Sequence, residues 1–126
     1  MPEIKKKILV VEDDPAVSKF LSVRLQSLNF EVTLAYDGEA ALKEARLRLP
    51  DLIILDLKLP KLTGEEVCKA VREDRDKKFA VTPIIMLTGK NTDTDRVIGM
   101  VIGANSYVMK PFRMENLLKE MRKFNL

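Results

Sequence analysis

Residues 52–64 read LIILDLKLPKLTG, in which four apolar residues lead directly into an aspartate. The apolar run, Leu52 to Leu55, has the length and composition of a strand buried on both faces of a sheet. An ionised carboxylate at the end of such a strand, here Asp56, is costly unless a positive charge or a hydrogen-bond donor meets it. We therefore expect another part of the chain to supply a charged partner for Asp56.

Short apolar runs followed by helical patterns recur along the whole chain. The predicted strands cover residues 8–11, 31–35, 52–55, 83–87 and 106–109, and helices are predicted to begin near residues 15, 38, 64, 92 and 114. Almost wholly apolar strands that alternate with helices indicate a parallel sheet covered on both faces, and right-handed crossovers make it doubly wound. The predicted fold class is α/β, with five β-α units in one domain over residues 1–126.

Several residues predict where the helices begin and end. Asp14 and Asp37 suit N-caps, the first of them followed by Pro15, and Gly103 suits a left-handed C-terminal cap. The apolar sides of the first two helices are predicted from helical spacing to comprise Val17, Phe20, Leu21, Val23, Leu25 and Leu28, and then Ala40, Ala41, Leu42, Ala45 and Leu49. The charged segment 72–83, REDRDKKFAVTP, is predicted to be a solvated loop.

The composition excludes several kinds of site. Without a histidine, the chain has no Ser-His or Cys-His nucleophile pair and no histidine-ligated metal. Its single cysteine, Cys68, excludes an internal disulfide and a cysteine zinc site, and we expect it to be buried on a helix. No apolar stretch approaches a membrane span or a signal peptide, and the scattered lysines accompany no DNA-binding pattern. We expect a cytoplasmic protein without direct nucleic-acid or membrane binding.

Charged and polar side chains follow the predicted strands, and parallel strands bring such positions together at the carboxyl edge of the sheet. They are Glu12, Asp13 and Asp14 after the first strand, Asp56 after the third, Thr88 after the fourth and Lys110 after the fifth. Two carboxylates about 4 Å apart repel by roughly 4 kcal/mol at an effective dielectric of about 20. Lys110 offsets one negative charge, and the oxygen-only ligand set favours Mg²⁺ or Mn²⁺ as the counter-charge for the rest.

Four motifs carry a resemblance to a known family: ILVVEDD at 8–14, PDLIILDLKLPKLTG at 50–64, PIIMLTGK at 83–90 and GANSYVMKPF at 103–112. In this order and spacing the chain resembles, over essentially its whole length, the receiver domain of two-component response regulators. The resemblance implies a flavodoxin-like fold with the strand order 2-1-3-4-5. It also implies that the Lys110–Pro111 peptide bond is cis and that Pro60 and Gly64 shape the loop after the acceptor.

The resemblance further assigns roles to the residues at the strand ends. Asp56 matches the phosphoacceptor nucleophile, and Thr88 and Lys110 match the hydroxyl and the lysine that assist it. The metal ligands implied for Mg²⁺ are Glu12, Asp13, Asp56 and the backbone carbonyl of Lys58. Tyr107 matches the aromatic residue that switches together with Thr88.

The activity that this resemblance implies is phosphoryl transfer from a phosphohistidine to Asp56 in the presence of Mg²⁺. The partner would be a sensor histidine kinase or a histidine phosphotransfer protein. The chain would catalyse only its own phosphorylation and autodephosphorylation, as a signalling phosphoacceptor rather than an enzyme. Thr88 would then contact the phosphoryl group, and Tyr107 would rotate inward from an exposed position. These changes would alter the face made by the helix before residue 103, the strand 106–109 and the last helix, for a downstream target protein or self-association.

Some positions differ from those of many family members. Ile98 and Val101 lie three residues apart where charged residues are common, which indicates an apolar docking patch or two tolerated surface aliphatics. Asn105 and Ser106 replace a frequent acidic pair. Lys58 and Lys90 follow Asp56 and Thr88 by two residues, where the family tunes the lifetime of the phosphoryl group.

Three other functions are compatible with parts of the pattern. A phosphatase of the haloacid dehalogenase type needs a second acid two residues after the nucleophile, where this chain has Lys58, and a flavodoxin needs an uncharged phosphate-binding first loop instead of EDDPAVS. A degenerate receiver that binds proteins without phosphorylation remains the alternative. The sequence does not identify the kinase, the output, the oligomeric state or the phosphoryl lifetime, and it fits a single-domain regulator as well as a piece of a larger regulator or hybrid kinase.

Overall fold

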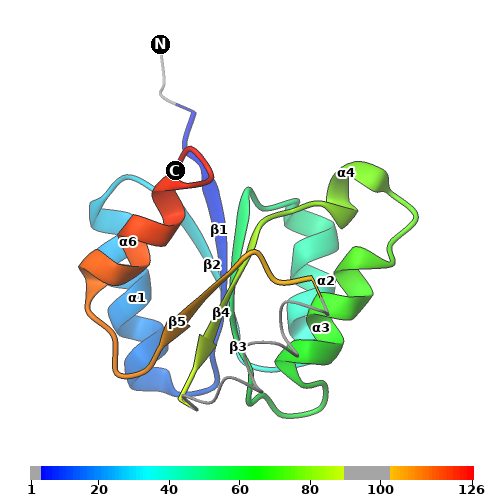
Figure 1. Cartoon of the computed structure of the whole chain (residues 1–126), viewed down its shortest axis with the longest axis horizontal. Helices are drawn as coiled ribbons and strands as arrows, with labels where there is room; N and C mark the ends of the chain where they lie inside the picture. The colour runs from blue at the N-terminus through cyan, green and yellow to red at the C-terminus, as the bar shows by residue number, and fades with distance from the viewer. Residues whose placement is uncertain (1–3, 90–102) are drawn as a thin grey trace.

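The computed structural model, which describes residues 4–89 and 103–126, contains one parallel sheet in the order β2-β1-β3-β4-β5. The strands are β1 Lys7–Val11, β2 Glu31–Ala35, β3 Leu52–Asp56, β4 Ile84–Thr88 and β5 Ser106–Met109; the described helices are α1 Pro15–Ser27, α2 Gly38–Arg48, α3 Gly64–Arg72, α4 Lys77–Ala80 and α6 Met114–Arg122. Helices α1 and α6 cover one face of the sheet, and α2 and α3 cover the other (Figure 1). The predicted fold class and strand order are therefore confirmed.

Two apolar clusters form the core, one on each face of the sheet. Successive strand residues point to opposite faces, so Leu9 and Ile53 belong to the cluster under α2 and α3. Their neighbours Ile8 and Leu52 belong to the cluster under α1 and α6. Because both faces are covered, the strands are apolar at nearly every position, as the sequence pattern indicates. None of the described helices has the length and apolar character needed to cross a membrane.

The helices begin where their capping residues predict. Asp14 Oδ1 accepts a hydrogen bond from Ala16 N at 2.9 Å, and Asp37 Oδ1 accepts one from Ala40 N at 2.8 Å. Helix α3 begins at Gly64, as predicted, and is preceded by a capping box that the sequence analysis did not identify. These caps satisfy backbone donors that an isolated helix end leaves without a partner.

The predicted solvated loop at residues 72–83 is wrong in its central part. Residues 77–80 form the one-turn helix α4, and Asp76 Oδ1 accepts hydrogen bonds from Lys78 N at 3.0 Å and Phe79 N at 3.3 Å. Phe79 and Ala80 are buried, and Phe79 belongs to the core under α3. A single turn is too short to produce a helical periodicity, so the many charged residues around it dominated the prediction.

The predicted apolar sides of α1 and α2 are wider than the buried surfaces. In α1, Leu21 and Leu25 are fully buried, but Phe20 and Val23 remain about half exposed, at 47% and 55%. Leu28 is 44% exposed just after the helix. Leu49 is 56% exposed because it forms the left-handed C-cap of α2 instead of continuing the helix. Helical spacing thus predicted the buried apolar residues of these two helices correctly, but the predicted apolar sides also included exposed residues beside them.

Arg72, the last residue of α3, ties this helix to the segments that precede β4 and β5. Its guanidinium donates to the carbonyl oxygens of Ala80, Thr82 and Gly103 at 2.8–2.9 Å, and to the side-chain oxygen of Asn105 at 2.7 Å. Asn105 Oδ1 also accepts a hydrogen bond from Ile84 N at 2.8 Å. Burial lowers the pKa of Arg72, because removing the guanidinium from water disfavours its charged form.

Replacing Arg72 with alanine is expected to lower the free energy of unfolding by about 3 kcal/mol, because several partly buried acceptors would lose their donor. Lysine should not restore it, since an ammonium cannot reproduce the planar fork. The measurement is urea unfolding, with Arg46→Ala as the control; Arg46 forms an exposed ion pair with Asp74 whose loss should cost less than about 1 kcal/mol. Equal losses in the two variants would contradict this role for Arg72.

Candidate functional site

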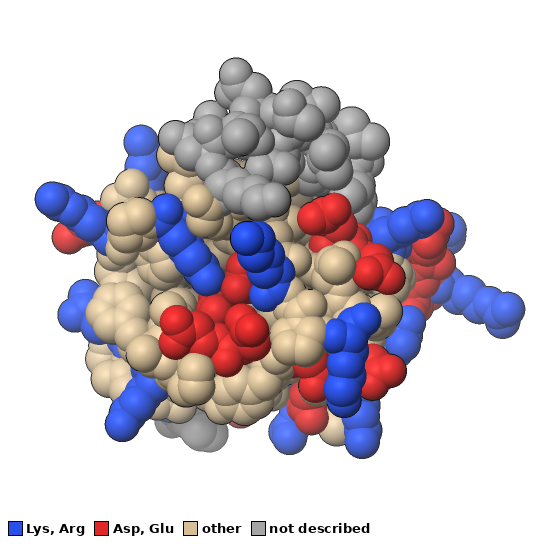
Figure 2. Space-filling view, turned by 90° about the horizontal axis from the view of Figure 1, so that it is seen from below, with Lys and Arg blue, Asp and Glu red and all other residues tan. Residues whose placement is uncertain are grey.

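The strand register brings the predicted site residues to one edge of the sheet. Val11 pairs with Leu55, and Asp56 pairs with Leu87, so Glu12, Asp56 and Thr88 lie in adjacent positions. The fourth pairing, Thr88 with Met109, places Lys110 beside them. Figure 2 looks onto this carboxyl edge and shows a patch of acidic side chains bordered by lysine and arginine side chains. The predicted meeting of these residues at the strand ends is confirmed.

Three carboxylates of this patch lie close enough to share one cation. Glu12, Asp13 and Asp56 each offer a carboxylate oxygen, and these three oxygens lie within 4.8 Å of one another. Glu12 is fully buried and Asp56 is 6% exposed, whereas Asp13 is exposed to solvent. The site therefore has two inner carboxylates and one at its mouth. Asp14 points away to cap α1, so it is not a member of this cluster.

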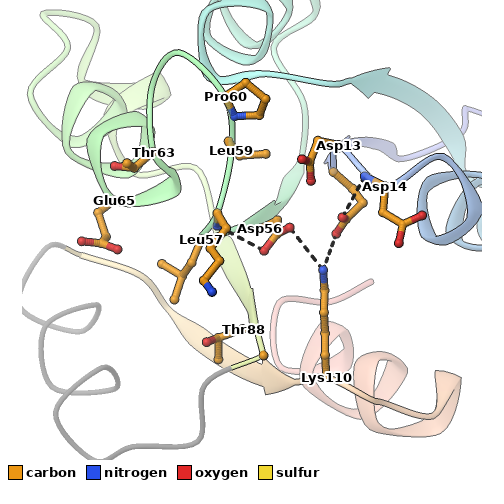
Figure 3. Close-up of a pocket in the computed structure, with 13 residues that line it drawn as sticks. Asp13, Asp14, Asp56, Leu57, Leu59, Pro60, Thr63, Glu65, Thr88 and Lys110 are labelled. Carbon is orange, nitrogen blue, oxygen red and sulfur yellow. Dashed lines mark hydrogen bonds and ion pairs between the residues drawn. The ribbon is translucent and has the colours of Figure 1, made fainter.

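Lys110 is the positive partner that Asp56 requires. Its Nζ donates to Glu12 Oε2 at 2.7 Å and to Asp56 Oδ2 at 3.2 Å (Figure 3). The lysine side chain is 25% exposed, so the pair is only partly screened by water. The peptide bond from Lys110 to Pro111 is cis, as the family resemblance implied. One ammonium, on the residue that follows the edge strand β5, thus contacts both inner carboxylates.

Burial and pairing shift the ionisation of these groups in opposing ways. Burial raises the pKa of Glu12 above its usual value, although the hydrogen bond from Lys110 opposes this shift. For Lys110, burial alone would lower the pKa, but the hydrogen bond to Glu12 and the charge of Asp56 outweigh burial and raise it. Lys110 is therefore firmly protonated at neutral pH and available as a fixed positive charge.

Hydrogen bonds hold the Asp56 carboxylate in one orientation. Its Oδ1 accepts from Lys58 N at 3.3 Å, while Oδ2 accepts from Lys110 Nζ at 3.2 Å. The start of α3 packs closely against the backbone of Asp56 and Leu57. A Cβ at Gly64 would lie only 2.3 Å from the backbone oxygen of Asp56, so glycine is required by close approach at this position. Asp56 is thus a rigidly placed carboxylate at a strand end.

The residues present fit a hard divalent cation. With all three acids ionised, the cluster carries three negative charges against the single positive charge of Lys110, which leaves two uncompensated. The ligand atoms are all oxygens, and the chain contains no histidine. Mg²⁺ prefers carboxylate and carbonyl oxygens, and Mn²⁺ accepts the same set. Glu12, Asp13 and Asp56 could hold such an ion.

Thr88 and further residues, some of which the sequence analysis missed, line the hollow around this cluster. Thr88 is buried at the end of β4, and the loop from Leu57 to Pro60 forms the opposite wall (Figure 3). Thr63 and Glu65 at the start of α3 also line the hollow but were not predicted as site residues. The T-x-x-E spacing of Thr63 and Glu66 is a capping-box signature that could have located this turn.

Other predicted site residues lie elsewhere. Tyr107 is half-buried and packs against the core cluster under α2 and α3, so its predicted exposed position is wrong. Its place in β5, paired with Met86, turns the ring toward that face of the sheet. Lys90 and the predicted docking patch of Ile98 and Val101 lie outside the described residues.

Known proteins share the sequence pattern and the fold of this chain. The sequence profile of the response regulator receiver domain matches residues 8–122. The alkaline phosphatase synthesis transcriptional regulatory protein PhoP of Bacillus subtilis is 45% identical over 109 residues, which cover 86% of this chain and 44% of that protein. The DNA-binding response regulator MtrA of Mycolicibacterium smegmatis is 39% identical over 97% of this chain and 51% of that protein. The chain spans about half the length of these curated relatives.

Solved structures show the same fold. The chemotaxis response regulator CheY4 of Vibrio cholerae superposes with a TM-score of 0.88 at 36% identity, covering 96% of this chain and 99% of that one. The receiver domain of the sensor histidine kinase PA1611 of Pseudomonas aeruginosa superposes with a TM-score of 0.86 at 31% identity, covering 98% of this chain and 100% of that one. That second structure is described as having a magnesium ion coordinated in its active site cleft.

Proposed function

Because the chain belongs to the response regulator receiver family, we propose that Asp56 accepts a phosphoryl group from a phosphohistidine on a partner protein. The observation that carries this proposal is the fixed Asp56 carboxylate, which both Lys58 N and Lys110 Nζ contact beside two further carboxylates. A carboxylate that only stabilised the fold would not need two other acids within reach. The same arrangement suits a nucleophile that meets a highly charged substrate.

In the proposed reaction an oxygen of Asp56 attacks phosphorus while the nitrogen–phosphorus bond of the donor breaks. The electron pair of that bond returns to the imidazole, and Asp56 becomes an acyl phosphate. Lys110 stabilises the charge on the phosphoryl oxygens from one side of the site. The N–H of Lys58 keeps the carboxylate oriented, so that little reorganisation is needed when the donor arrives.

Glu12, Asp13, Asp56 and the Lys58 carbonyl would hold Mg²⁺ in this reaction. Bound there, the ion would neutralise phosphoryl oxygens that the acidic cluster otherwise repels. The magnesium ion described in the PA1611 receiver structure supports the same use of the cluster here. Glu12 is fully buried and already paired with Lys110, so we expect Asp13 and Asp56 to provide the more direct ligands.

The donor would be a sensor histidine kinase or a histidine phosphotransfer protein, since the chain has no histidine of its own. A shallow apolar hollow formed by Val17, Phe20, Pro111 and Phe112 lies next to Lys110. Phe20 is 47% exposed there, which supports contact with the apolar surface of a protein donor. We expect this encounter to take place in the cytoplasm.

Phosphorylation would act on the surface near β5. The hydroxyl of Thr88 would donate to the new phosphoryl oxygens, and the half-buried Tyr107 would move further inward. The backbone already links the strands that carry these residues, because β4 pairs with β5 and Lys110 N donates to Thr88 O at 2.7 Å. The altered face would bind a downstream protein or a second copy of the chain. Hydrolysis of the acyl phosphate by the chain itself would reset the site, with Lys58 and Lys90 affecting its lifetime.

The test is incubation with the small phosphodonor acetyl phosphate, followed by intact-mass analysis. We expect a gain of one phosphoryl group in the presence of Mg²⁺ and no gain when the metal is chelated before acetyl phosphate is added. Peptide mapping should locate the group on the peptide that contains Asp56. If the chain binds Mg²⁺ but gains no mass from acetyl phosphate or from any phosphohistidine donor, the proposal fails and a receiver that acts by binding alone remains.

A further inference from the structure

The loop from Leu57 to Thr63 lies between the acidic site and the beginning of α2. On one side, Leu57, Lys58, Leu59 and Pro60 line the hollow that holds Asp56. On its other side, the loop contacts the first residues of α2, which follow the edge strand β2. The edge strand β2 supplies no side chain to the acidic cluster, yet the helix that follows it touches the loop that lines the hollow around that cluster.

Three kinds of contact join this loop to α2. Gly38 N donates to Pro60 O at 3.3 Å, and Leu62 packs against the core cluster under α2 and α3. Lys61 Nζ lies 3.7 Å from Asp37 Oδ2 and 3.6 Å from Glu39 Oε2. The Lys61 side chain is 59% exposed, so these ion pairs contribute little to the position of the loop. The backbone and apolar contacts therefore define the position of the loop.

Gly38 sets how closely the loop approaches α2. A Cβ at this position would lie 2.4 Å from both Leu62 Cβ and Leu62 O, which is far inside van der Waals contact. Gly38 does not have a positive φ, so its backbone conformation does not demand glycine; the close approach does. The absence of a side chain at Gly38 thus allows the loop to pack directly on α2.

A shift at Leu62 would be transmitted to Lys58. The two ends of the loop are fixed, because Leu57 N donates to Leu87 O at 3.1 Å and Gly64 N donates to Leu57 O at 2.9 Å. Any displacement caused at Leu62 must therefore be absorbed by residues 58–63. Lys58, whose N–H orients Asp56 Oδ1, is part of that segment. The segment also carries the Lys58 carbonyl, which is one of the proposed metal ligands.

We propose that Gly38 is a positioning residue for the acidic site, acting through Leu62 and the loop on the Lys58 carbonyl and N–H. This inference rests on the proposed function, because it assumes that the Lys58 carbonyl takes part in Mg²⁺ binding. The start of α2 would then influence the Mg²⁺ affinity of the site, although no residue of α2 belongs to the acidic cluster. Groups that hydrogen-bond to metal ligands typically change metal affinity by about 10–100-fold when they are lost, and Gly38 would act on one such ligand, the Lys58 carbonyl, through the position of the loop.

The experiment compares Mg²⁺ affinity by titration calorimetry in the intact protein, in Gly38→Ala and in Ala45→Gly. Gly38→Ala should bind Mg²⁺ at least about tenfold more weakly. Ala45→Gly weakens the same helix seven positions further along, without a Cβ directed at the loop, and should bind within about twofold of the intact protein. A purely structural role for Gly38 would lower Tm in both variants and leave both affinities unchanged.

Hydrogen exchange of the unmodified protein gives a second measurement that does not depend on any variant folding. Mg²⁺ binding that is coupled to the loop should stabilise the loop against local opening, so Mg²⁺ should slow exchange at Gly38 N–H, which donates to Pro60 O. Unchanged exchange, or unchanged affinity in Gly38→Ala, would overturn this inference while leaving the proposed function intact. Failure of the intact protein to bind Mg²⁺ would overturn both.

Discussion

Asp56→Asn is expected to abolish the gain of one phosphoryl group from acetyl phosphate under conditions in which the unmodified protein is phosphorylated. The amide keeps the shape of the side chain but has no anionic oxygen with which to attack phosphorus. It also removes one of the three carboxylates that lie within 4.8 Å of one another, so the repulsion in the metal-free site falls. We therefore expect the metal-free variant to have a Tm at least as high as that of the unmodified protein.

The matched control is Asp51→Asn, at an exposed aspartate whose Oδ2 accepts a hydrogen bond from Lys7 N at 2.8 Å. This control should retain full phosphorylation, measured by intact mass in the same series. A phosphoryl group that persists in Asp56→Asn would show that another residue accepts it. A folded Asp56→Asn variant with a raised Tm and no phosphorylation would separate the loss of the nucleophile from the loss of structure.

Lys110→Met is expected to slow phosphorylation by about 10²–10³-fold, the usual consequence of removing one charge-stabilising donor from an active site. Methionine has nearly the same length and preserves packing, but it cannot donate to Glu12 or Asp56. Both carboxylates would then lack the ammonium that now lies 2.7 and 3.2 Å away. The metal-free variant should also be less stable, and Mg²⁺ should recover part of that loss through the linkage of binding to folding.

Initial rates of phosphorylation with acetyl phosphate provide the measurement for Lys110→Met, at a Mg²⁺ concentration that saturates each variant. Lys123→Met is the control, because Lys123 forms a largely exposed ion pair with Glu120 far from the strand ends. That control should leave the rate unchanged. A Lys110→Met rate within about threefold of the unmodified protein would show that the lysine serves only to stabilise the fold, since a single charge-stabilising donor is worth far more.

The sequence was sufficient to predict the sheet and the residues at its carboxyl edge. Nearly continuous apolar strands occur almost only in parallel sheets with both faces covered, which in turn places Glu12, Asp56 and Lys110 together. Helical spacing likewise predicted that Leu21 and Leu25 are buried. Continuous apolar strands, helical spacing, and the charged or polar residues that directly follow four of the five strands carried these predictions.

Features that depend on close backbone approach could not be predicted in this way. Arg72 uses backbone carbonyl oxygens as acceptors, and these have no signature in the sequence. The need for glycine at position 38 arises from Leu62, twenty-four residues away, and becomes visible only when the two segments are placed in space. The one-turn helix α4 was missed because four residues are too few to reveal a period.

The hydrogen bond from Lys110 to Glu12 joins residues that are 98 positions apart in the chain, and this separation has a consequence for synthesis on the ribosome. Because Lys110 follows β5, the last strand, the complete site cannot form from an N-terminal fragment that ends before residue 110. A nascent chain that has exposed only β1 to β3 would present Asp56 without its ammonium partner. Competence to accept a phosphoryl group should therefore appear late, once residue 110 and the helix behind it have left the exit tunnel. Under the proposed function, a phosphohistidine donor would then encounter only complete domains.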